Sequence, residues 1–307
     1  MTNRVAIIDL GTNTFHLAVA EVVPGGFTIL YRERQPVKIG MGGINQGIIT
    51  EAGIDRALMT LASFKETLRD YQPSRVMAFG TSALRNAKNK NDVISKIIQT
   101  TGFECKIISG EEEAEYIYYG VRTAVSLGKE KSLIVDIGGG SVEFIIGNEK
   151  EIFWKHSFEI GAQRLLERFQ KHDPITTEEL AQVESHFDEQ LTELMDAIQL
   201  HPVKTLVGSS GTFDTLSDIY CIREGFTPEV TPETPLTIQA FQEIYEELLQ
   251  KNRAERLLIP GMIEMRVDMI VVACCLIQYL VKSLSLQKIR VSSYSLKEGV
   301  LATLSGF

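Results

Sequence analysis

Two acidic residues, Asp136 and Glu143, stand on either side of a run of three glycines and a serine, 138–141. Successive glycines leave backbone N–H groups bare of side chains, and such groups form a concave site that suits a phosphate. Carboxylates would repel a bare phosphate, so their presence here suggests a hard cation such as Mg²⁺ between them and the substrate oxygens. The alternative is an ordinary tight turn between two strands, which this stretch alone does not exclude.

The N-terminal stretch repeats this pattern. Its matching positions keep one constant spacing from those of the central turn: Asp9 with Asp136, Gly11 with Gly138, and Thr14 with Ser141. A second pair of glycine loops, at Gly80 and Gly208, follows apolar runs at almost the same spacing. Chance turns would not keep register in this way. The chain therefore is predicted to contain two related halves that present glycine loops to a shared cleft.

Two basic residues stand near these loops. Arg85 lies one turn beyond Gly80, where a helix is expected to begin, and its planar guanidinium could hold a phosphate in a two-pronged grip. Lys38 lies in a loop rich in basic residues and glycine, 32–43. The alternative for both is a solvated surface charge. We favour the phosphate role for Arg85, whereas the residues alone leave the two interpretations of Lys38 nearly equal.

The elements that must position these residues are predicted to be strands alternating with helices. Strands are expected at 4–9, 15–22, 27–34, 75–80, 104–108, 133–135, 142–146, 152–158, 203–207 and 288–292. Helices are expected at 51–70, 91–100, 110–127, 176–200, 213–219, 238–249, 253–258 and 262–283, with a last one starting at 295 and a loop over 225–235. Arg266 and Asp268 within 262–283 could pair with each other and serve only structure.

The composition is that of a globular protein with an excess of acidic residues. The 307 residues are 44% hydrophobic and carry a net charge of −9, which argues against a nucleic-acid partner, since such binding needs a basic face. The longest apolar run, 269–280, is shorter than the ~20 residues that a membrane span needs. The four cysteines lack metal-type spacing, and the N-terminus leads straight into a predicted strand. We expect a cytoplasmic protein with reduced thiols and no membrane partner.

Several motifs, in order and spacing, resemble those of the Ppx/GppA family of exopolyphosphatases and guanosine-pentaphosphate phosphohydrolases. They are Asp9-Leu-Gly-Thr-Asn-Thr14, Gly80-Thr-Ser-Ala-Leu-Arg85, Ile108-Ser-Gly-Glu-Glu-Glu-Ala114, Val135-Asp-Ile-Gly-Gly-Gly-Ser-Val-Glu143, Gly161-Ala-Gln-Arg-Leu165, Gly208-Ser-Ser-Gly-Thr212 and Leu296-Lys-Glu-Gly-Val300. The resemblance implies an α/β protein with the two-domain fold of actin-like ATPases and sugar kinases (ribonuclease H-like). We place the domains at 1–128 and 129–307, and allow the last helix, 296–307, to pack back on the first.

The resemblance also supplies roles for individual residues. Glu113 matches the family's catalytic glutamate, which spacing alone could not distinguish from Glu111 and Glu112, both of which are explained as partners of the helix dipole. A basic residue near Lys38 contacts substrate phosphates in the family. The complete candidate site has Glu113 and Arg85 as catalytic residues, Gly11, Thr12, Asn13, Thr14, Lys38, Gly138, Gly139, Gly140, Ser141, Gly211 and Thr212 as substrate-binding residues, and Asp136, Glu143 and Asp9 as metal ligands.

The reaction that this resemblance implies is hydrolysis of a terminal phosphoanhydride with Mg²⁺, or alternatively Mn²⁺, as cofactor. Inorganic polyphosphate is the first expected substrate and guanosine pentaphosphate the second. An ATP-dependent kinase of the same superfamily and a non-catalytic polyphosphate or nucleotide sensor are further alternatives. The sequence leaves a homodimer open. It departs from the family pattern at Glu159, Ile160, Gln163, Ser295 and Lys297, which puts the contacts of the neighbouring Arg164 in question.

Overall fold

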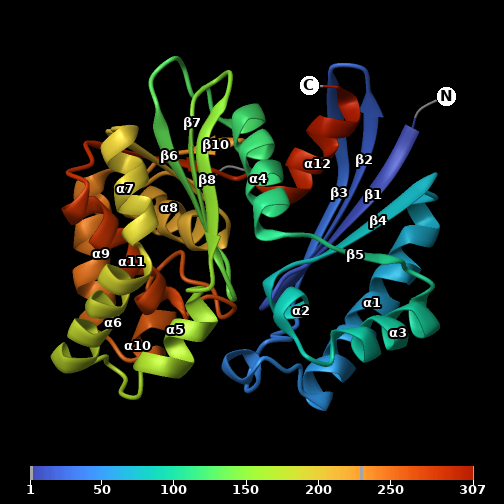
Figure 1. The fold of residues 1–307 in the computed structure, drawn as a ribbon, viewed down its shortest axis with the longest axis horizontal. Coiled ribbons are helices and arrows are strands. Elements are labelled where there is room, and N and C mark those ends of the chain that lie inside the picture. The colour runs from blue at the N-terminus through green and yellow to red at the C-terminus, as the bar shows by residue number, and fades with distance from the viewer. Residues whose placement is uncertain (1–2, 229–230, 307) are drawn as a thin grey trace.

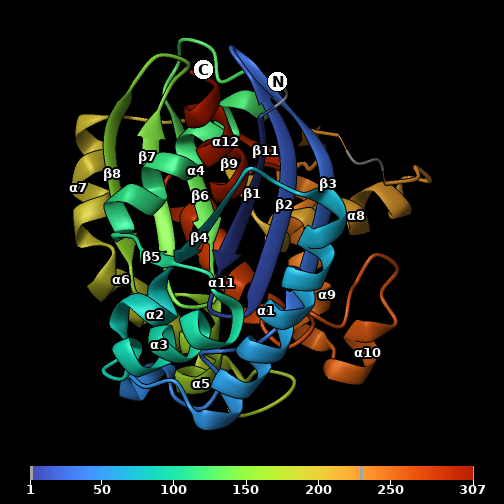
Figure 2. The same cartoon turned by 90° about the vertical axis from the view of Figure 1, so that its right-hand side faces the viewer.

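The computed structural model describes residues 3–228 and 231–306, and within them the chain forms two sheets flanked by helices (Figure 1). The first sheet has the strand order β3-β2-β1-β4-β5. Its strands are β1 (Asn3–Leu10), β2 (Thr14–Val23), β3 (Gly26–Pro36), β4 (Arg75–Gly80) and β5 (Cys105–Ile107). The first three are antiparallel neighbours, and β4 and β5 run parallel to β1. Figure 2 shows the three long strands side by side with a pronounced twist.

The second sheet repeats this arrangement. Its order, read from the opposite edge, is β8-β7-β6-β9-β11, with β10 added at the end. The strands are β6 (Ser132–Ile137), β7 (Val142–Gly147), β8 (Ile152–Phe158), β9 (Thr205–Ser209), β10 (Glu233–Thr234) and β11 (Lys288–Ser292). Again three antiparallel strands are followed by two parallel ones. The two related halves predicted from the glycine loops are therefore confirmed.

Helices cover the outer face of each sheet (Figure 1). The first half has the 3-10 turn η1 (Ile44–Gln46) and the helices α1 (Glu51–Tyr71), α2 (Ser82–Asn86) and α3 (Lys90–Thr101). The second half has α5 (Ala162–Phe169), α6 (Thr177–Gln190), α7 (Thr192–Leu200), α8 (Gly211–Arg223), α9 (Ile238–Gln250), α10 (Arg253–Leu257) and α11 (Ile270–Ser283). Each half has its own hydrophobic core between its sheet and these helices.

Two further helices, α4 (Gly110–Ala124) and α12 (Leu296–Ser305), lie between the sheets (Figure 1). Their apolar side chains pack with those of both sheets in a third core cluster that includes Ile7, Ile134 and Leu301. The two helices touch through backbone, because a Cβ on Gly120 would lie 2.0 Å from the carbonyl oxygen of Ser295 and one on Gly299 1.7 Å from that of Tyr116. Only glycine permits this approach. The last helix, α12, also contacts β1, β2 and β3 of the first sheet. The domain division at residue 128 stays a prediction.

Three predicted elements differ from the structure. The single helix expected over 176–200 is two helices, because the buried Leu191 has φ −100° and ψ 18°, outside the helical range. The helix expected over 262–283 starts only at Ile270. Residues 264–269 instead form turns, in which the apolar residues happen to have helical spacing. The loop predicted over 225–235 contains the short β10, and its residues 229–230 lie outside the described part of the chain. No helix of the described residues is long and apolar enough to cross a membrane.

Candidate active site

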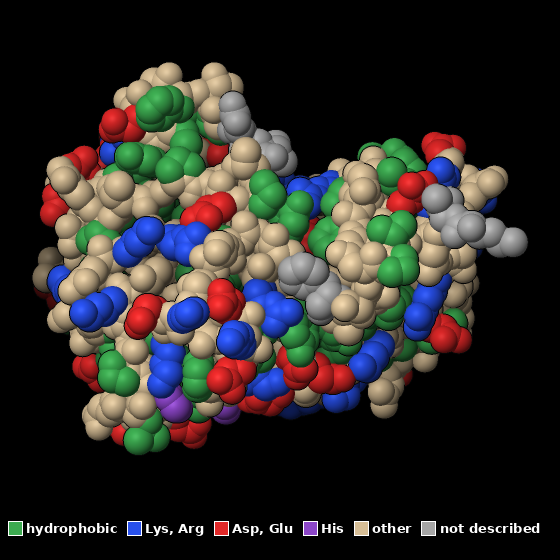
Figure 3. Space-filling view, turned by 90° about the horizontal axis from the view of Figure 1, so that it is seen from above, with side chains coloured by type: hydrophobic (Ala, Val, Ile, Leu, Met, Phe, Trp, Pro, Cys, Tyr) green, Lys and Arg blue, Asp and Glu red, His purple; other side chains and the backbone are tan. Residues whose placement is uncertain are grey.

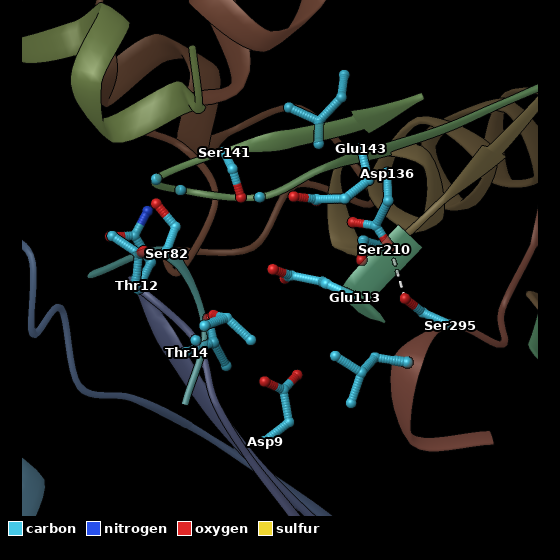
Figure 4. A pocket seen from close by; sticks show the side chains of 18 of the residues that line it. Asp9, Thr12, Thr14, Ser82, Glu113, Asp136, Ser141, Glu143, Ser210 and Ser295 are labelled. Carbon is cyan, nitrogen blue, oxygen red and sulfur yellow. Dashed lines mark hydrogen bonds between the residues drawn. The ribbon is translucent and has the colours of Figure 1, made fainter. Parts of the chain in front are cut away.

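A narrow cavity of about 80 Å³ lies between the two halves, where the glycine turns of both sheets meet (Figure 4). It has room for only a few water-sized groups. Most of the predicted site residues line it: Asp9, Gly11, Thr12, Asn13, Thr14, Glu113, Asp136, Gly138, Gly139, Gly140, Ser141 and Glu143. The structure thus brings together residues from β1, α4 and the hairpin β6–β7.

The glycines of the central turn are required by close approach to the other half. A Cβ on Gly140 would lie 2.4 Å from Ser82 Oγ and 2.5 Å from Thr12 Oγ1, and one on Gly139 would lie 2.4 Å from Asn13 Nδ2. A side chain at either position would therefore require these side chains of the first half to shift. The turn is closed by a backbone hydrogen bond from Gly138 N to Ser141 O of 3.0 Å.

Asp136 and Glu143 face the cavity from directly paired positions on β6 and β7. Both are buried, since 5% and 1% of their surface is exposed. Asp136 Oδ2 accepts hydrogen bonds from Ser295 Oγ at 2.5 Å and from Ser209 Oγ at 3.1 Å, whereas Glu143 Oε1 accepts one from Ser157 Oγ at 2.7 Å. Burial, and then the charge of Asp136, raises the pKa of Glu143 to about 7. Hydrogen bonds from Ser141 and Ser157 and the charge of Arg85 oppose this rise in the pKa of Glu143 without cancelling it.

Asp9 faces the same cavity from the end of β1 (Figure 4). Burial raises its pKa to about 6, although the charge of Lys297 opposes this rise. Among the described residues no three Asp, Glu, His or Cys side chains are close enough to hold a metal ion by themselves. A cation here would complete its shell with water and substrate oxygens, as Mg²⁺ usually does with one or two carboxylates. The buried carboxylates fit such an ion, because its charge would stabilise their ionised forms.

Glu113 reaches the cavity because of the way α4 begins. Ser109 caps the helix, accepting a hydrogen bond from Glu112 N at 3.1 Å, and the Glu112 carboxylate accepts one from Ser109 N at 2.9 Å. This turns Glu112 outward to Lys106 and turns Glu113 inward, where 8% of its surface is exposed. Burial, followed by the charge of Glu143, raises the pKa of Glu113 well above its ordinary value, while Arg85 opposes the shift.

Arg85 borders the site through the side chain of Glu113. Its Nη1 donates to Glu113 Oε2 at 2.8 Å, and its Nη2 lies 3.2 Å from Glu159 Oε1. Arg164 lies on the opposite side of Glu159, with Nη2 2.9 Å from Oε2, and its Nε donates to Gly140 O at 2.7 Å. Both guanidiniums are therefore engaged with carboxylates and backbone beside the glycine turn.

Lys38, Gly211 and Thr212 do not line the cavity. Lys38 Nζ instead pairs with Asp268 across the cleft at 3.2 Å, and Asp268 also pairs with Arg253 at 2.7 Å. Arg266 and Asp268, which the sequence allowed to pair with each other, form no ion pair among the described residues, because Asp268 pairs with Lys38 and Arg253 instead. In the loop after β9, Ser210 lines the cavity in place of its neighbours Gly211 and Thr212.

Several lining residues were missed by sequence reasoning: Ser82, His16, Ser210, Arg266 and Ser295. Arg266 carries a buried Nε without a hydrogen-bond partner among the described residues, and its guanidinium packs on Gly211, where a Cβ would lie 2.0 Å from Nη2. Burial lowers its pKa, although the charge of Asp214 opposes this. The signal in the sequence was that Arg266 is the one basic residue in the stretch 262–272. A continuous helix over 262–283 would have placed Arg266 inside the helix, whereas the structure places it in a turn before Ile270.

Paired glycine turns that face each other across a carboxylate-lined cleft, on two sheets of repeated topology, define an α/β protein of the actin-like ATPase and sugar-kinase class. Within this class, the chain belongs to the Ppx/GppA phosphatase family, whose model matches residues 18–305.

Individual relatives agree with this assignment. The chain is 44% identical in sequence to an exopolyphosphatase from Cytophaga hutchinsonii whose crystal structure is known. The two structures superpose with a TM-score of 0.96, over 99% of this chain and 98% of that one. The PPX-GPPA enzyme of Aquifex aeolicus is 25% identical with a TM-score of 0.81, covering 99% of this chain and all (100%) of its own. A protein of Haemophilus influenzae described as a putative exopolyphosphatase is 29% identical over 301 residues, 98% of this chain and 91% of the relative.

Proposed function

We propose that this protein is a cytoplasmic, Mg²⁺-dependent exopolyphosphatase that hydrolyses the terminal phosphoanhydride of inorganic polyphosphate. The observation that carries the proposal is the position of Glu113, a buried carboxylate held by Arg85 at 2.8 Å in the cavity that both glycine turns line. A hydrolase needs such a group where the end phosphate would bind. The relatives described as exopolyphosphatases support the same substrate.

In this mechanism the backbone N–H groups of the turns at 11–14 and 138–141 bind the end phosphate. Glu113 orients a water molecule and accepts its proton as the water oxygen bonds to phosphorus. The anhydride bond breaks, orthophosphate is released, and the shortened chain keeps the bridging oxygen. Arg85 fixes the Glu113 carboxylate and offsets negative charge that develops at the phosphate.

Asp136 and Glu143, with Asp9 nearby, would hold the Mg²⁺ ion. When bound, this ion supplies charge neutralisation at the phosphate oxygens. Ser209 and Ser295 both hydrogen-bond Oδ2 of Asp136 and thereby fix its orientation toward the cavity.

The side-by-side release of phosphate from long-chain polyphosphate, guanosine pentaphosphate and ATP tests the proposal. We expect polyphosphate to give the highest kcat/KM. Faster release from guanosine pentaphosphate would assign the alternative substrate, in which the same turns bind the 5′-terminal phosphate. Tight binding of polyphosphate without release from any of the three would instead identify a sensor.

A further inference from the structure

The carboxylate of Glu159 occupies a position that is built for an anion. It follows β8 directly, and both of its oxygens are bound: Oε1 lies 3.2 Å from Arg85 Nη2, and Oε2 accepts from Ser82 Oγ at 2.6 Å and from Arg164 Nη2 at 2.9 Å. Two guanidiniums and a hydroxyl converging on one acidic group is the arrangement that proteins use to bind phosphate.

The anion position adjoins the phosphate turn. Arg164 donates through Nε to Gly140 O at 2.7 Å, so one guanidinium contacts both the glycine turn and Glu159. Ser82 lies against the same glycine and lines the cavity. Arg85 joins Glu159 to Glu113, because its Nη1 is bound to the latter. A phosphate chain whose end sits in the cavity would therefore meet these two arginines next.

The contacts of Glu159 also cross the cleft. Ser82 and Arg85 belong to the first half, whereas Glu159 and Arg164 belong to the second. The side chain of Glu159 is nevertheless accessible, with 39% of it exposed, while the two arginines are 16% and 15% exposed. It can therefore swing outward into water, whereas the guanidiniums are held by their surroundings.

We propose that Glu159 is a specificity-determining residue: its carboxylate fills a phosphate subsite formed by Arg85, Arg164 and Ser82, and a substrate must displace it. This inference rests on the proposed function. A polyphosphate chain carries several negative charges and can outcompete one carboxylate for two arginines, whereas a phosphomonoester whose only phosphate sits at the glycine turns gains nothing from the subsite. Glu159 would thus bias the enzyme toward extended phosphate chains.

The test compares Glu159→Gln with the wild-type enzyme. The amide keeps the size of the side chain but loses the charge that competes for the arginines. Methylenediphosphonate, a non-hydrolysable analogue with two phosphorus centres, is titrated in the presence of Mg²⁺, and KM is measured with polyphosphate. We expect both the Kd of the analogue and the KM to fall about three- to tenfold, the range for loss of partly exposed charge-assisted pairs.

Glu167→Gln is the matched control. Glu167 also crosses the cleft, accepting a hydrogen bond from Gly42 N at 2.9 Å, but among the described residues its carboxylate forms no ion pair with either arginine. We expect its Kd and KM to stay within twofold of wild type. Glu159→Asp, which keeps the charge on a shorter stem that cannot reach both halves, should fall between wild type and Glu159→Gln.

Each outcome decides. An unchanged or raised Kd in Glu159→Gln overturns the proposal, since it would show that Glu159 only holds the cleft closed. A lowered kcat with unchanged Kd also overturns it, because Glu159 would then act by positioning Arg85. If wild type binds the analogue but does not hydrolyse polyphosphate, the proposed function fails while the ratio of Kd values still decides on Glu159. If wild type binds neither compound, both proposals fail.

Discussion

At the scale of single residues, three consecutive glutamates have three different surroundings. Glu111 faces His156 on the surface, Glu112 pairs with Lys106 and completes the helix cap, and Glu113 is buried beside Arg85. All three carry the same charge and lie in the first turn of α4, so the helix dipole acts on each of them. Only the direction in which each side chain leaves the turn separates a catalytic candidate from its neighbours.

Replacing Glu113 by glutamine should collapse turnover while preserving binding. The amide keeps the size of the side chain but cannot accept a proton from water, and groups of this kind typically contribute ~10²–10⁴-fold. The variant also removes a negative charge near a polyanion, so polyphosphate affinity should stay equal or rise slightly. Steady-state phosphate release and equilibrium binding are measured on the same sample. Turnover within a few-fold of wild type would mean that water is activated elsewhere.

The pH dependence of kcat/KM should show the raised pKa of Glu113. Burial and the charge of Glu143 favour its protonated form, and the reactive form is the carboxylate. Activity therefore rises with pH through a pKa well above the usual 4.5 and is lost as pH falls below it. The measurement is a pH–rate profile at saturating Mg²⁺. If the residual activity of Glu113→Gln showed the same acidic limb, the limb would belong to another group.

Arg85→Lys should be damaging although it keeps the charge. The guanidinium spans two carboxylates, with Nη1 on Glu113 and Nη2 on Glu159, and a single ammonium group cannot reproduce this planar fork. We expect kcat to fall at least about tenfold, the effect of losing roughly one charge-assisted hydrogen bond. Lys88→Arg, at an exposed position near the same turn and outside the cavity, is a suitable control. Wild-type turnover in Arg85→Lys would return Arg85 to the role of a surface charge.

At the scale of elements, the contact between α4 and α12 sets the site. Glu113 lies at the start of α4, and Ser295 and Lys297 lie at the start of α12, so the crossing of the two helices fixes how these residues meet Asp136 and Asp9. The crossing depends on Gly120 of α4 and Gly299 of α12, where the backbones of the two helices touch.

Gly299→Ala should therefore destabilise the protein. The new Cβ would lie 1.7 Å from Tyr116 O, so the helices must separate, and overpacking of this kind costs about 1–3 kcal/mol. Urea unfolding monitored by circular dichroism should show a lower midpoint. Gly26→Ala is the control, since its Cβ would have no atom within 4 Å. Equal midpoints for the two variants would show that the helices have room to shift.

At the scale of the whole molecule, the halves are tied across the cleft by a few polar contacts. Lys38 reaches Asp268, Arg164 reaches Ile44 O, and Glu167 accepts from Gly42 N. On the face drawn in Figure 3, blue basic side chains are interspersed with red acidic ones rather than gathered into one patch. The concentrated anion-binding features lie instead inside the cleft, so a ligand there should hold both halves together.

Mg²⁺ and substrate should stabilise the protein jointly, and chelation should remove activity. The buried carboxylates repel a phosphate unless a cation lies between them, so we expect excess EDTA to abolish phosphate release and added Mg²⁺ to restore it. Methylenediphosphonate with Mg²⁺ should raise Tm. At an analogue concentration of 100 times Kd, binding should increase the free energy of unfolding by roughly 2.7 kcal/mol. Either component alone should have a smaller effect. Full activity in excess chelator would contradict the metal role of Asp136 and Glu143.

Patterns in the sequence were enough to predict the duplicated fold and most of the cavity lining. Asp9 and Asp136 each stand at the end of an apolar run and just before a glycine turn. Such a strand and turn depend mainly on short-range sterics, so neighbouring residues are enough to predict them. The same locality explains the errors, because apolar spacing over 176–200 and 262–283 cannot show that Leu191 leaves the helical conformation or that a helix starts only at Ile270.

Which side chains share the cavity became clear only from the three-dimensional arrangement of the chain. The inward direction of Glu113, the burial of Arg266 beside Gly211, and the pairing of Lys38 with Asp268 all join residues far apart in the chain or choose between equivalent neighbours. Glu159 is the clearest case, since its three partners lie up to 77 positions away. Charge interactions depend on distance and burial in space, and neither quantity is encoded in local spacing.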